Sequence, residues 1–358
     1  MNFDLSEEQE LFTSTVDRFT SSIDVETRHR LRGQEGGYDK SRWTELAELG
    51  LIALAAPEDS GGMGGSKLDL ALVGEALGRN IAPDPWLDNG VLPARILAAA
   101  GADELLEAVL TGERFAAFAW AERTQRYNLQ AAQAKVSGGA LTGEKSFVMG
   151  AALADTLIVT AHDGDTTTLL CIPTDRDGLE IRQYRLADGS IAGEVRFNRV
   201  AINDGDRLEL APADLATIIA DARLLTAAEL VGLGQRLLDD TIAYVKEREQ
   251  FGTAIGSFQV IQHRLVDCYA KIEQARSMLY RAALEDSSDS ANWRRSCAGA
   301  KAYIGEAVDH VAREAVQLHG GMGVTDELTI GHAMKRVLLL NRLFGDIDTS
   351  LAEFAQAA

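Results

Sequence analysis

The feature that most constrains the fold is a series of apolar stripes after residue 210. Apolar residues recur there at every third or fourth position in three long segments, and a shorter stripe covers 334–344. This spacing puts them on one face of an α-helix, which has to be buried against other helices. The stripes therefore predict an antiparallel four-helix bundle. The long stripes comprise Leu224, Ala228, Val231, Leu238, Ile242 and Val245; Ile261, Leu265, Cys268, Ile272, Ala275 and Leu279; and Ile304, Val308, Val311, Ala315 and Leu318.

Two regions with different residue patterns precede the bundle. Residues 1–112 read as an N-terminal helical domain. Residues 113–209 carry short β-rich runs at 115–120, 155–161, 167–172, 179–184 and 194–197, separated by Gly, Asp and Asn. Many short strands between turn signals predict a small antiparallel barrel or sandwich. We therefore expect an α+β protein with three domains, at 1–112, 113–209 and 210–358.

The formal net charge of −19 limits the partners of the chain. Its field repels nucleic acid and anionic membrane surfaces. No run approaches the roughly 18 apolar residues of a transmembrane helix, and the acidic N-terminus lacks the apolar core of a signal peptide. The three cysteines have no metal-binding or redox spacing, which fits a reducing compartment. We expect a cytoplasmic protein without a metal site, a nucleic-acid partner or a membrane anchor.

A polar cluster at the end of the first long stripe is the first candidate binding element. It contains Arg248, Gln250, Phe251, Gly252 and, slightly later, Gln259. A guanidinium offers a fixed fork of donors that suits a pyrophosphate. Glutamine side chains can pair with the amide edges of a flavin or an adenosine.

A second cluster ends the third long stripe. Gln317 and His319 supply polar contacts, and Gly320 and Gly321 would let backbone N–H groups approach a phosphate because no Cβ blocks them. Alternatively, Gly252 and the paired glycines only terminate helices, with Arg248 on a solvated face. Both clusters in one chain, in this order and after a β-rich region, favour a ligand site.

Together the clusters resemble the acyl-CoA dehydrogenase family, and the resemblance covers nearly the whole chain. Residues 57–64, Pro-Glu-Asp-Ser-Gly-Gly-Met-Gly, are similar to that family's Pro-Glu-x-x-Gly-Gly-x-Gly. In the family, an Arg-x-x-Phe-Gly element of one subunit and a Gln-x-x-Gly-Gly element of its neighbour meet on one FAD. The resemblance thus implies an oligomer with two sets of FAD contacts. One set is Arg248, Gln250, Phe251 and Gln259; the other is Gln317, Gly320 and Gly321.

The β region departs from the family pattern beside the flavin. The usual Thr-Glu-Pro followed by Gly-Ser-Asp reads Ala-Trp-Ala-Glu-Arg-Thr-Gln-Arg at 119–126, where only Glu122 survives. The usual Trp and Thr next to the isoalloxazine are replaced by Phe147 and Met149. Phe147 can still stack on a flavin, whereas Met149 has no hydroxyl to donate.

The catalytic base is the second departure. Family enzymes remove a proton α to the thioester with a glutamate in a Tyr-Glu-Gly-Thr element, while hydride leaves the β carbon for the flavin. Here Phe344 stands in the glutamate's place. Some relatives place the glutamate before an arginine of the first bundle helix, and here that residue is Ala222. Asp346 is the nearest carboxylate. Its side chain is shorter than that of glutamate and it stands at a different position, so it would be poorly placed to reach the substrate proton.

The resemblance leaves three functional classes open. In the first, the chain is the base-less subunit of a heteromeric acyl-CoA dehydrogenase. Such bacterial assemblies act on bulky acyl-CoA, including steroid side-chain esters, and share each FAD between unlike subunits. In the second, the chain is a self-sufficient dehydrogenase that uses Asp346. In the third, it is a structural pseudoenzyme. Either enzyme class implies FAD, an acyl-CoA substrate and electron-transfer flavoprotein as acceptor.

Overall fold

The computed structural model describes residues 5–21, 23–34 and 37–356, and the chain divides into two compact units. The first unit combines Met1–Arg30, Ser66–Ala82 and Ala220–Ala358, and the second combines Leu31–Gly65 and Pro83–Ile219. Each unit is built from separate stretches of sequence. The three consecutive regions expected from the sequence describe the chain in another way, and their boundaries remain a prediction.

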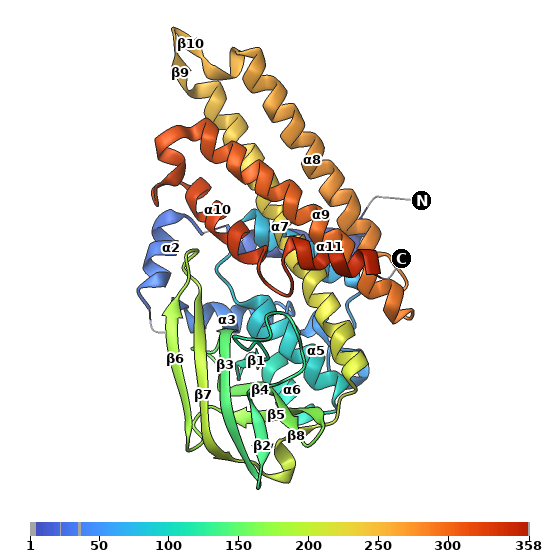
Figure 1. The fold of residues 1–358 in the computed structure, drawn as a ribbon. Coiled ribbons are helices and arrows are strands. Elements are labelled where there is room, and N and C mark those ends of the chain that lie inside the picture. Colours follow the sequence, from blue (N-terminus) through green and yellow to red (C-terminus); the bar gives the residue numbers. More distant parts are fainter. Residues whose placement is uncertain (1–4, 22, 35–36, 357–358) are drawn as a thin grey trace. The chain divides into compact units, whose positions relative to one another are not determined.

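The first unit is helical, and long helices run side by side in it (Figure 1). The helices of its C-terminal part are α7 (Pro212–Glu247, which starts in the second unit), α8 (Gln259–Ala283), α9 (Ser290–His319), α10 (Thr329–Leu340) and α11 (Ile347–Gln356). The predicted stripes form the core, since Val231, Ile272 and Val308 are fully buried. The predicted C-terminal helical bundle is therefore confirmed.

Two N-terminal helices, α1 (Glu7–Thr20) and α4 (Lys67–Arg79), pack against each other in the first unit. Each begins with a capping box, at Ser6 and Ser66, in which the serine hydroxyl and the third helical residue satisfy each other's backbone N–H. These caps fix where both helices start.

Helix α4 crosses α7 at two glycines. A Cβ on Gly78 would lie 2.1 Å from the Glu229 carbonyl oxygen, and a Cβ on Gly232 would lie 1.9 Å from that of Glu75. The two backbones thus approach more closely than any side chain would allow.

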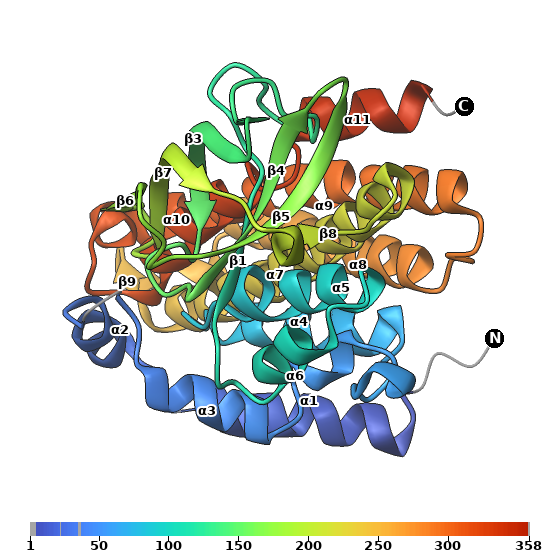
Figure 2. The ribbon, with the colours of Figure 1, turned by 90° about the horizontal axis from the view of Figure 1, so that it is seen from below.

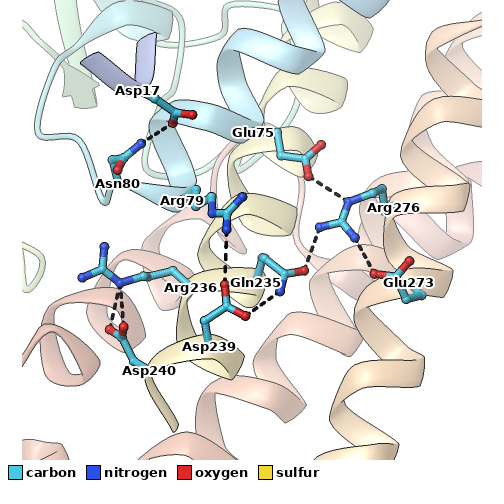
Figure 3. A network of polar contacts seen from close by, with 10 residues as sticks. All are labelled: Asp17, Glu75, Arg79, Asn80, Gln235, Arg236, Asp239, Asp240, Glu273 and Arg276. Atoms are coloured by element: carbon cyan, nitrogen blue, oxygen red, sulfur yellow. Dashed lines mark hydrogen bonds and ion pairs between the residues drawn. The ribbon is translucent and has the colours of Figure 1, made fainter. Parts of the chain in front are cut away.

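Polar side chains beside this crossing join α4, α7 and α8 (Figure 3). The guanidinium of Arg276 contacts Glu75 at 2.9 Å, Glu273 at 2.5 Å and the amide oxygen of Gln235 at 2.9 Å. The amide nitrogen of Gln235 donates to Asp239. The network explains why the polar Gln235 lies between the apolar Val231 and Leu238 of the α7 stripe.

The second unit combines short helices with a sheet, and α5 and α6 lie side by side in it (Figure 2). Its helices are α3 (Lys40–Glu48), a π-helix (Trp86–Val91), α5 (Leu92–Ala99) and α6 (Asp103–Leu110), while α2 (Val25–Arg32) crosses the boundary between the units. The strands are β1 (Ala116–Ala119), β2 (Lys135–Ser137), β3 (Ala140–Met149), β4 (Thr156–Asp163), β5 (Thr166–Pro173), β6 (Leu179–Arg185), β7 (Ile191–Ala201) and β8 (Arg207–Leu208).

The strand order is β6-β7-β3-β2-β4-β5-β8, with β1 added beside β4. The central β region is confirmed, but the expectation of a purely antiparallel arrangement needs correction. Strand β4 pairs in parallel with both β1 and β2, so the sheet is mixed. Three strands of this sheet, β2, β3 and β8, are not among the predicted runs. Apolar residues of the sheet such as Leu157, Leu170 and Phe197 form its buried core.

Candidate functional site

The first predicted cluster forms a hairpin between α7 and α8. Strands β9 (Glu249–Gln250) and β10 (Thr253–Ala254) pair through a two-residue turn at Phe251 and Gly252, whose φ angles are 56° and 80°. Two successive left-handed residues give the turn that matches strand twist, and the second of them favours glycine. Phe251 accepts this strained conformation and leaves its side chain 95% exposed.

The polar residues of this cluster have fixed backbones and open side chains. The N–H of Arg248 donates to Tyr244 and its carbonyl accepts from Ile255, each at 2.8 Å. Arg248, Gln250 and Gln259 are nevertheless exposed. Within the described ranges, no carboxylate forms an ion pair with the Arg248 guanidinium. That donor fork is therefore available to an anionic ligand.

The second cluster caps α9. Gly320 has φ 61° and ψ −140°, and a short 3-10 segment, Gly320–Val324, follows it. A Cβ added to Gly320 or Gly321 would meet nothing within 4 Å, and Gln317 beside them is exposed. The glycines thus terminate the helix, and they leave its backbone there accessible to a ligand. Gly320 is the C-cap of α9, as the helix-end alternative expects, whereas Gly252 ends no helix, because α7 ends at Glu247 and Gly252 lies in the hairpin turn. A helix cap does not exclude ligand binding.

The two clusters lie at the same end of the helices of the first unit (Figure 1). Tyr244, one turn before Arg248, stacks on His319 with ring centroids 4.2 Å apart. His319 is buried and its Nδ1 lies 2.8 Å from the carbonyl oxygen of Ala315. It is therefore a packing residue that joins the clusters, rather than an open contact as the sequence suggested.

In the second unit, Phe147 occupies a bulge of β3. The register between β3 and β7 shifts between Lys145 and Val148, and Phe147 has φ 55°. Non-glycine residues rarely adopt this conformation, so the surrounding structure must hold it in place. The Phe147 side chain is partly exposed, as is that of Met149.

A buried ion pair lies next to this bulge, and it was not predicted. Nζ of Lys145 contacts Glu122 at 2.8 Å, and neither side chain is more than 1% exposed. Burial raises the pKa of Glu122, but hydrogen bonds from Lys145 and from three backbone N–H groups outweigh it and lower that pKa overall. Burial lowers the pKa of Lys145 despite the opposing charge of Glu122.

The two positions at which the sequence resemblance leads us to expect a base are both buried and lack a carboxylate. Ala222, in α7, is 2% exposed, and Phe344, after α10, is 5% exposed. Nε of Arg223 donates to the Phe344 carbonyl at 2.7 Å, so one residue links the two positions. Phe344 has φ 56°, which means that its conformation too depends on its surroundings.

Asp346 serves as a helix cap. Its carboxylate accepts the N–H of Thr349 at 2.9 Å in the first turn of α11, and Arg342 lies 3.6 Å away. The residue is 8% exposed. Another carboxylate of the bundle, Glu229, accepts hydrogen bonds from two guanidinium nitrogens of Arg336, Nε at 2.6 Å and Nη2 at 2.9 Å.

Sequence reasoning missed Lys301, the most deeply buried cation near these positions. Its Nζ donates to the Leu340 carbonyl at 2.6 Å, at the end of α10. Burial, and then the charge of Arg223, lower the pKa of Lys301 to about 7, although Asp346 and Glu229 oppose this. The signal in the sequence was a lysine in the alanine-rich stripe of α9, three positions before Ile304.

Cys171, Cys268 and Cys297 are free, and burial raises the pKa of Cys171 to about 12 and that of Cys268 to about 11. Across residues 5–21, 23–34 and 37–356, no helix is both long and apolar enough to traverse a lipid bilayer.

Comparison with known proteins supplies the family. Residues 6–112 match the acyl-CoA dehydrogenase N-terminal domain, and residues 214–358 match the acyl-CoA dehydrogenase C-terminal domain. The acyl-CoA dehydrogenase IpdE2 of Mycolicibacterium smegmatis is 33% identical over 334 residues, which span 93% of each chain.

Solved structures agree over the full length. A variant of the Tcur3481-Tcur3483 steroid ACAD has a TM-score of 0.87 and 28% identity, covering 98% of this chain and 97% of that one. PigA with FAD and proline has a TM-score of 0.89 and 25% identity, covering 99% and 98%. This chain therefore belongs to the acyl-CoA dehydrogenase family, whose members are FAD-dependent oxidoreductases.

Proposed function

We propose that this chain is the subunit without the catalytic glutamate in a heteromeric acyl-CoA dehydrogenase. The assembly would introduce an α,β double bond into a bulky, steroid-type acyl-CoA. One observation supports the proposal: Phe344 and Ala222, which the family resemblance puts at the two base positions, are both buried, and Arg223 next to Ala222 bonds to the Phe344 carbonyl. Neither side chain can accept a proton, so the α-proton must go to a carboxylate of another chain.

The residues of the two clusters fit FAD. Arg248 is exposed and has a fixed backbone, as a pyrophosphate ligand needs. Gly320 and Gly321 expose backbone that a Cβ would otherwise shield. Gln250, Gln259 and Gln317 would read the polar edges of the cofactor, and Phe147 would stack on its ring. When bound, FAD supplies the hydride acceptor for the β carbon.

The exposed hairpin supports a partner chain. Phe251 is strained and 95% exposed, which is unfavourable unless another surface covers the ring. The Tcur3481-Tcur3483 name joins two proteins and describes a steroid ACAD. We infer from both that a second acyl-CoA dehydrogenase-like subunit covers the hairpin and that the substrate is bulky. Electron-transfer flavoprotein would reoxidise the flavin.

A self-sufficient enzyme based on Asp346 is the second candidate. Asp346 is the nearest carboxylate to the base position in sequence, which favours it. However, its oxygen already accepts the Thr349 N–H, and Arg342 lies near it. The Asp346 carboxylate is thus already engaged by groups of its own chain. This arrangement favours the heteromeric assignment.

The test is to purify the chain alone and with the product of a neighbouring gene that carries an intact glutamate. Bound FAD is measured from the visible spectrum, and turnover from an acyl-CoA screen with an artificial electron acceptor. We expect FAD and turnover in the co-purified complex and no turnover by the chain alone. Absence of FAD from both preparations would instead favour a structural pseudoenzyme.

A further inference from the structure

The two segments of the second unit that face the flavin in the proposed function are joined by one buried ion pair. The first segment follows β1 and contains Glu122, and the second is the bulge of β3 that carries Phe147. Lys145 precedes the bulge. Its Nζ donates to Glu122 at 2.8 Å, to the Thr160 hydroxyl at 2.9 Å and to the Trp120 carbonyl at 3.2 Å. The three donors of the ammonium group are therefore all used.

Glu122 organises its own segment in the same way. One carboxylate oxygen accepts the N–H groups of Ala132 and Gln133 at 2.9 and 2.8 Å, and the other accepts that of Ala134 at 3.1 Å. These bonds fold residues 122–134 back on themselves. With Lys145, they account for four hydrogen bonds to one buried carboxylate, so either partner left alone would be an uncompensated buried charge.

The bulge is held from both ends. The N–H of Ser146 donates to the Ala121 carbonyl at 2.9 Å, which ties the bulge to the Glu122 segment. On its other side lies Tyr184 of β6, where burial raises the pKa of the hydroxyl and the nearby backbone N–H of Phe147 opposes that rise. Tyr184 is in register with Ala192, which pairs with Met149 at the end of β3. The left-handed conformation of Phe147 thus has support on both sides.

We propose that Glu122, Lys145 and Tyr184 are positioning residues that set the Phe147 ring against the flavin. The inference rests on the proposed function, because it takes Phe147 as the stacking side chain. A residue at φ 55° relaxes toward ordinary backbone geometry when its supports are removed. Such relaxation would move the ring away from the isoalloxazine while the rest of the sheet stays folded.

The experiment uses the full chain in whichever preparation binds FAD, alone or with its partner. The variants are Glu122→Gln, Tyr184→Phe and Phe147→Ala, and the first two are also combined with Phe147→Ala. Glu144→Gln is the matched control, because Glu144 precedes Lys145 in β3 but forms an exposed ion pair with Arg196. The readouts are the bound-flavin absorbance, its fluorescence quenching, the FAD affinity and the far-UV circular dichroism.

We expect Phe147→Ala to shift the flavin spectrum and relieve the quenching. Glu122→Gln and Tyr184→Phe should reproduce part of that change, and they should add nothing to it in the Phe147→Ala background. Glu144→Gln should match the wild type. Should Glu122→Gln fail to fold, Tyr184→Phe remains decisive, because it removes only a hydroxyl from a half-buried ring.

Two results would overturn the inference. One is that the bound-flavin spectra of Tyr184→Phe and Glu122→Gln equal that of the wild type while Phe147→Ala changes it. The other is that their effects add fully to that of Phe147→Ala. Failure of the proposed function looks different: the wild type would bind no FAD in either preparation, or Phe147→Ala would leave the bound flavin unchanged.

Discussion

At the residue scale, the proposed function separates two sets of residues, those suited to holding FAD and those at the positions where the family resemblance leads us to expect a base. Arg248 is exposed at a fixed backbone position, whereas Phe344 and Ala222 are buried without a carboxylate. Cofactor binding and proton removal depend on different residues, so one can be lost without the other. Substitutions can therefore test the two separately.

Arg248→Ala should weaken FAD binding by about 2–3 kcal/mol, because it removes charged hydrogen bonds to the pyrophosphate. Arg248→Lys should lose less, since the charge remains but the fork does not. The control is Arg264→Ala, because Arg264 pairs with Glu314 at 2.5 Å within the bundle. FAD titration measures all three. Equal affinities in wild type and Arg248→Ala would show that Arg248 is only a surface charge.

Phe344→Glu should give the isolated, FAD-loaded chain measurable acyl-CoA turnover. A correctly placed base contributes about a hundredfold or more. Phe344→Gln is the matched control, because it has the same shape as the glutamate variant and no basic carboxylate. Steady-state kinetics with an artificial acceptor distinguishes them. Equal rates in the two variants would mean that position 344 does not face the substrate.

Asp346→Asn should leave the turnover of the complex unchanged. Asparagine caps a helix about as well as aspartate, so stability should also change little, whereas Asp346→Ala should cost about 1 kcal/mol. The expected cost of Asp346→Ala rests on the hydrogen bond that the Thr349 N–H donates to the Asp346 carboxylate. Chemical denaturation and steady-state kinetics are the measurements. A large loss of turnover in Asp346→Asn would identify Asp346 as the base.

At the scale of elements, the helices of the first unit tolerate little change where their backbones touch. The crossing of α4 and α7 has room for hydrogen alone at Gly78 and Gly232. Gly232→Ala should therefore destabilise the protein by about 2–3 kcal/mol, despite alanine's higher helix propensity. In Gly205→Ala the added Cβ meets nothing within 4 Å and serves as control. Equal unfolding midpoints for both variants would contradict the close contact.

Lys301 makes stability depend on pH. Its pKa in the folded protein is lowered to about 7 from the ordinary 10.5, so between these values the unfolded chain binds more protons. Stability should then rise with pH, by at most about 1.4 kcal/mol per pH unit from this residue. Below pH 7, Lys301 is protonated in both the folded and the unfolded protein, and its destabilising effect on the folded state is at its maximum. The difference in unfolding free energy between wild type and Lys301→Met should follow this trend, and a constant difference between pH 7 and 9 would refute it.

Elements with a regular period were predictable, and contacts between distant segments were not. The stripe containing Val231 predicts its helix because every third or fourth residue is apolar. Strand β3 escaped because a bulge and a left-handed Phe147 break its alternation. The parallel pairing of β1 with β4, at Phe118 and Ile158, joins segments 40 residues apart. The partner of Lys145, at Glu122, is likewise set by tertiary structure.

At the scale of the whole molecule, some assignments of site residues rest on the sequence of this chain, and others concern the assembly that it forms. The clusters at Arg248 and Gly320 could be located from sequence because glycine and arginine are distinctive at helix ends. Both clusters are exposed, and that they meet on one FAD in an oligomer stays a prediction. The proposal that this chain lacks a base rests on Phe344 and Ala222, which the sequence alone supplies. The proposed dependence on a partner concerns the assembly and stays a prediction.

The most direct test of the central claim is acyl-CoA turnover by three preparations: this chain with FAD, the chain with a glutamate-bearing partner, and the chain with that partner's glutamate changed to glutamine. A bulky acyl-CoA and an artificial electron acceptor are used throughout. We predict turnover in the second preparation only. Turnover by the isolated chain at an ordinary enzymatic rate, on the order of 1–10 per second, would contradict the account, because it would require a base within this chain.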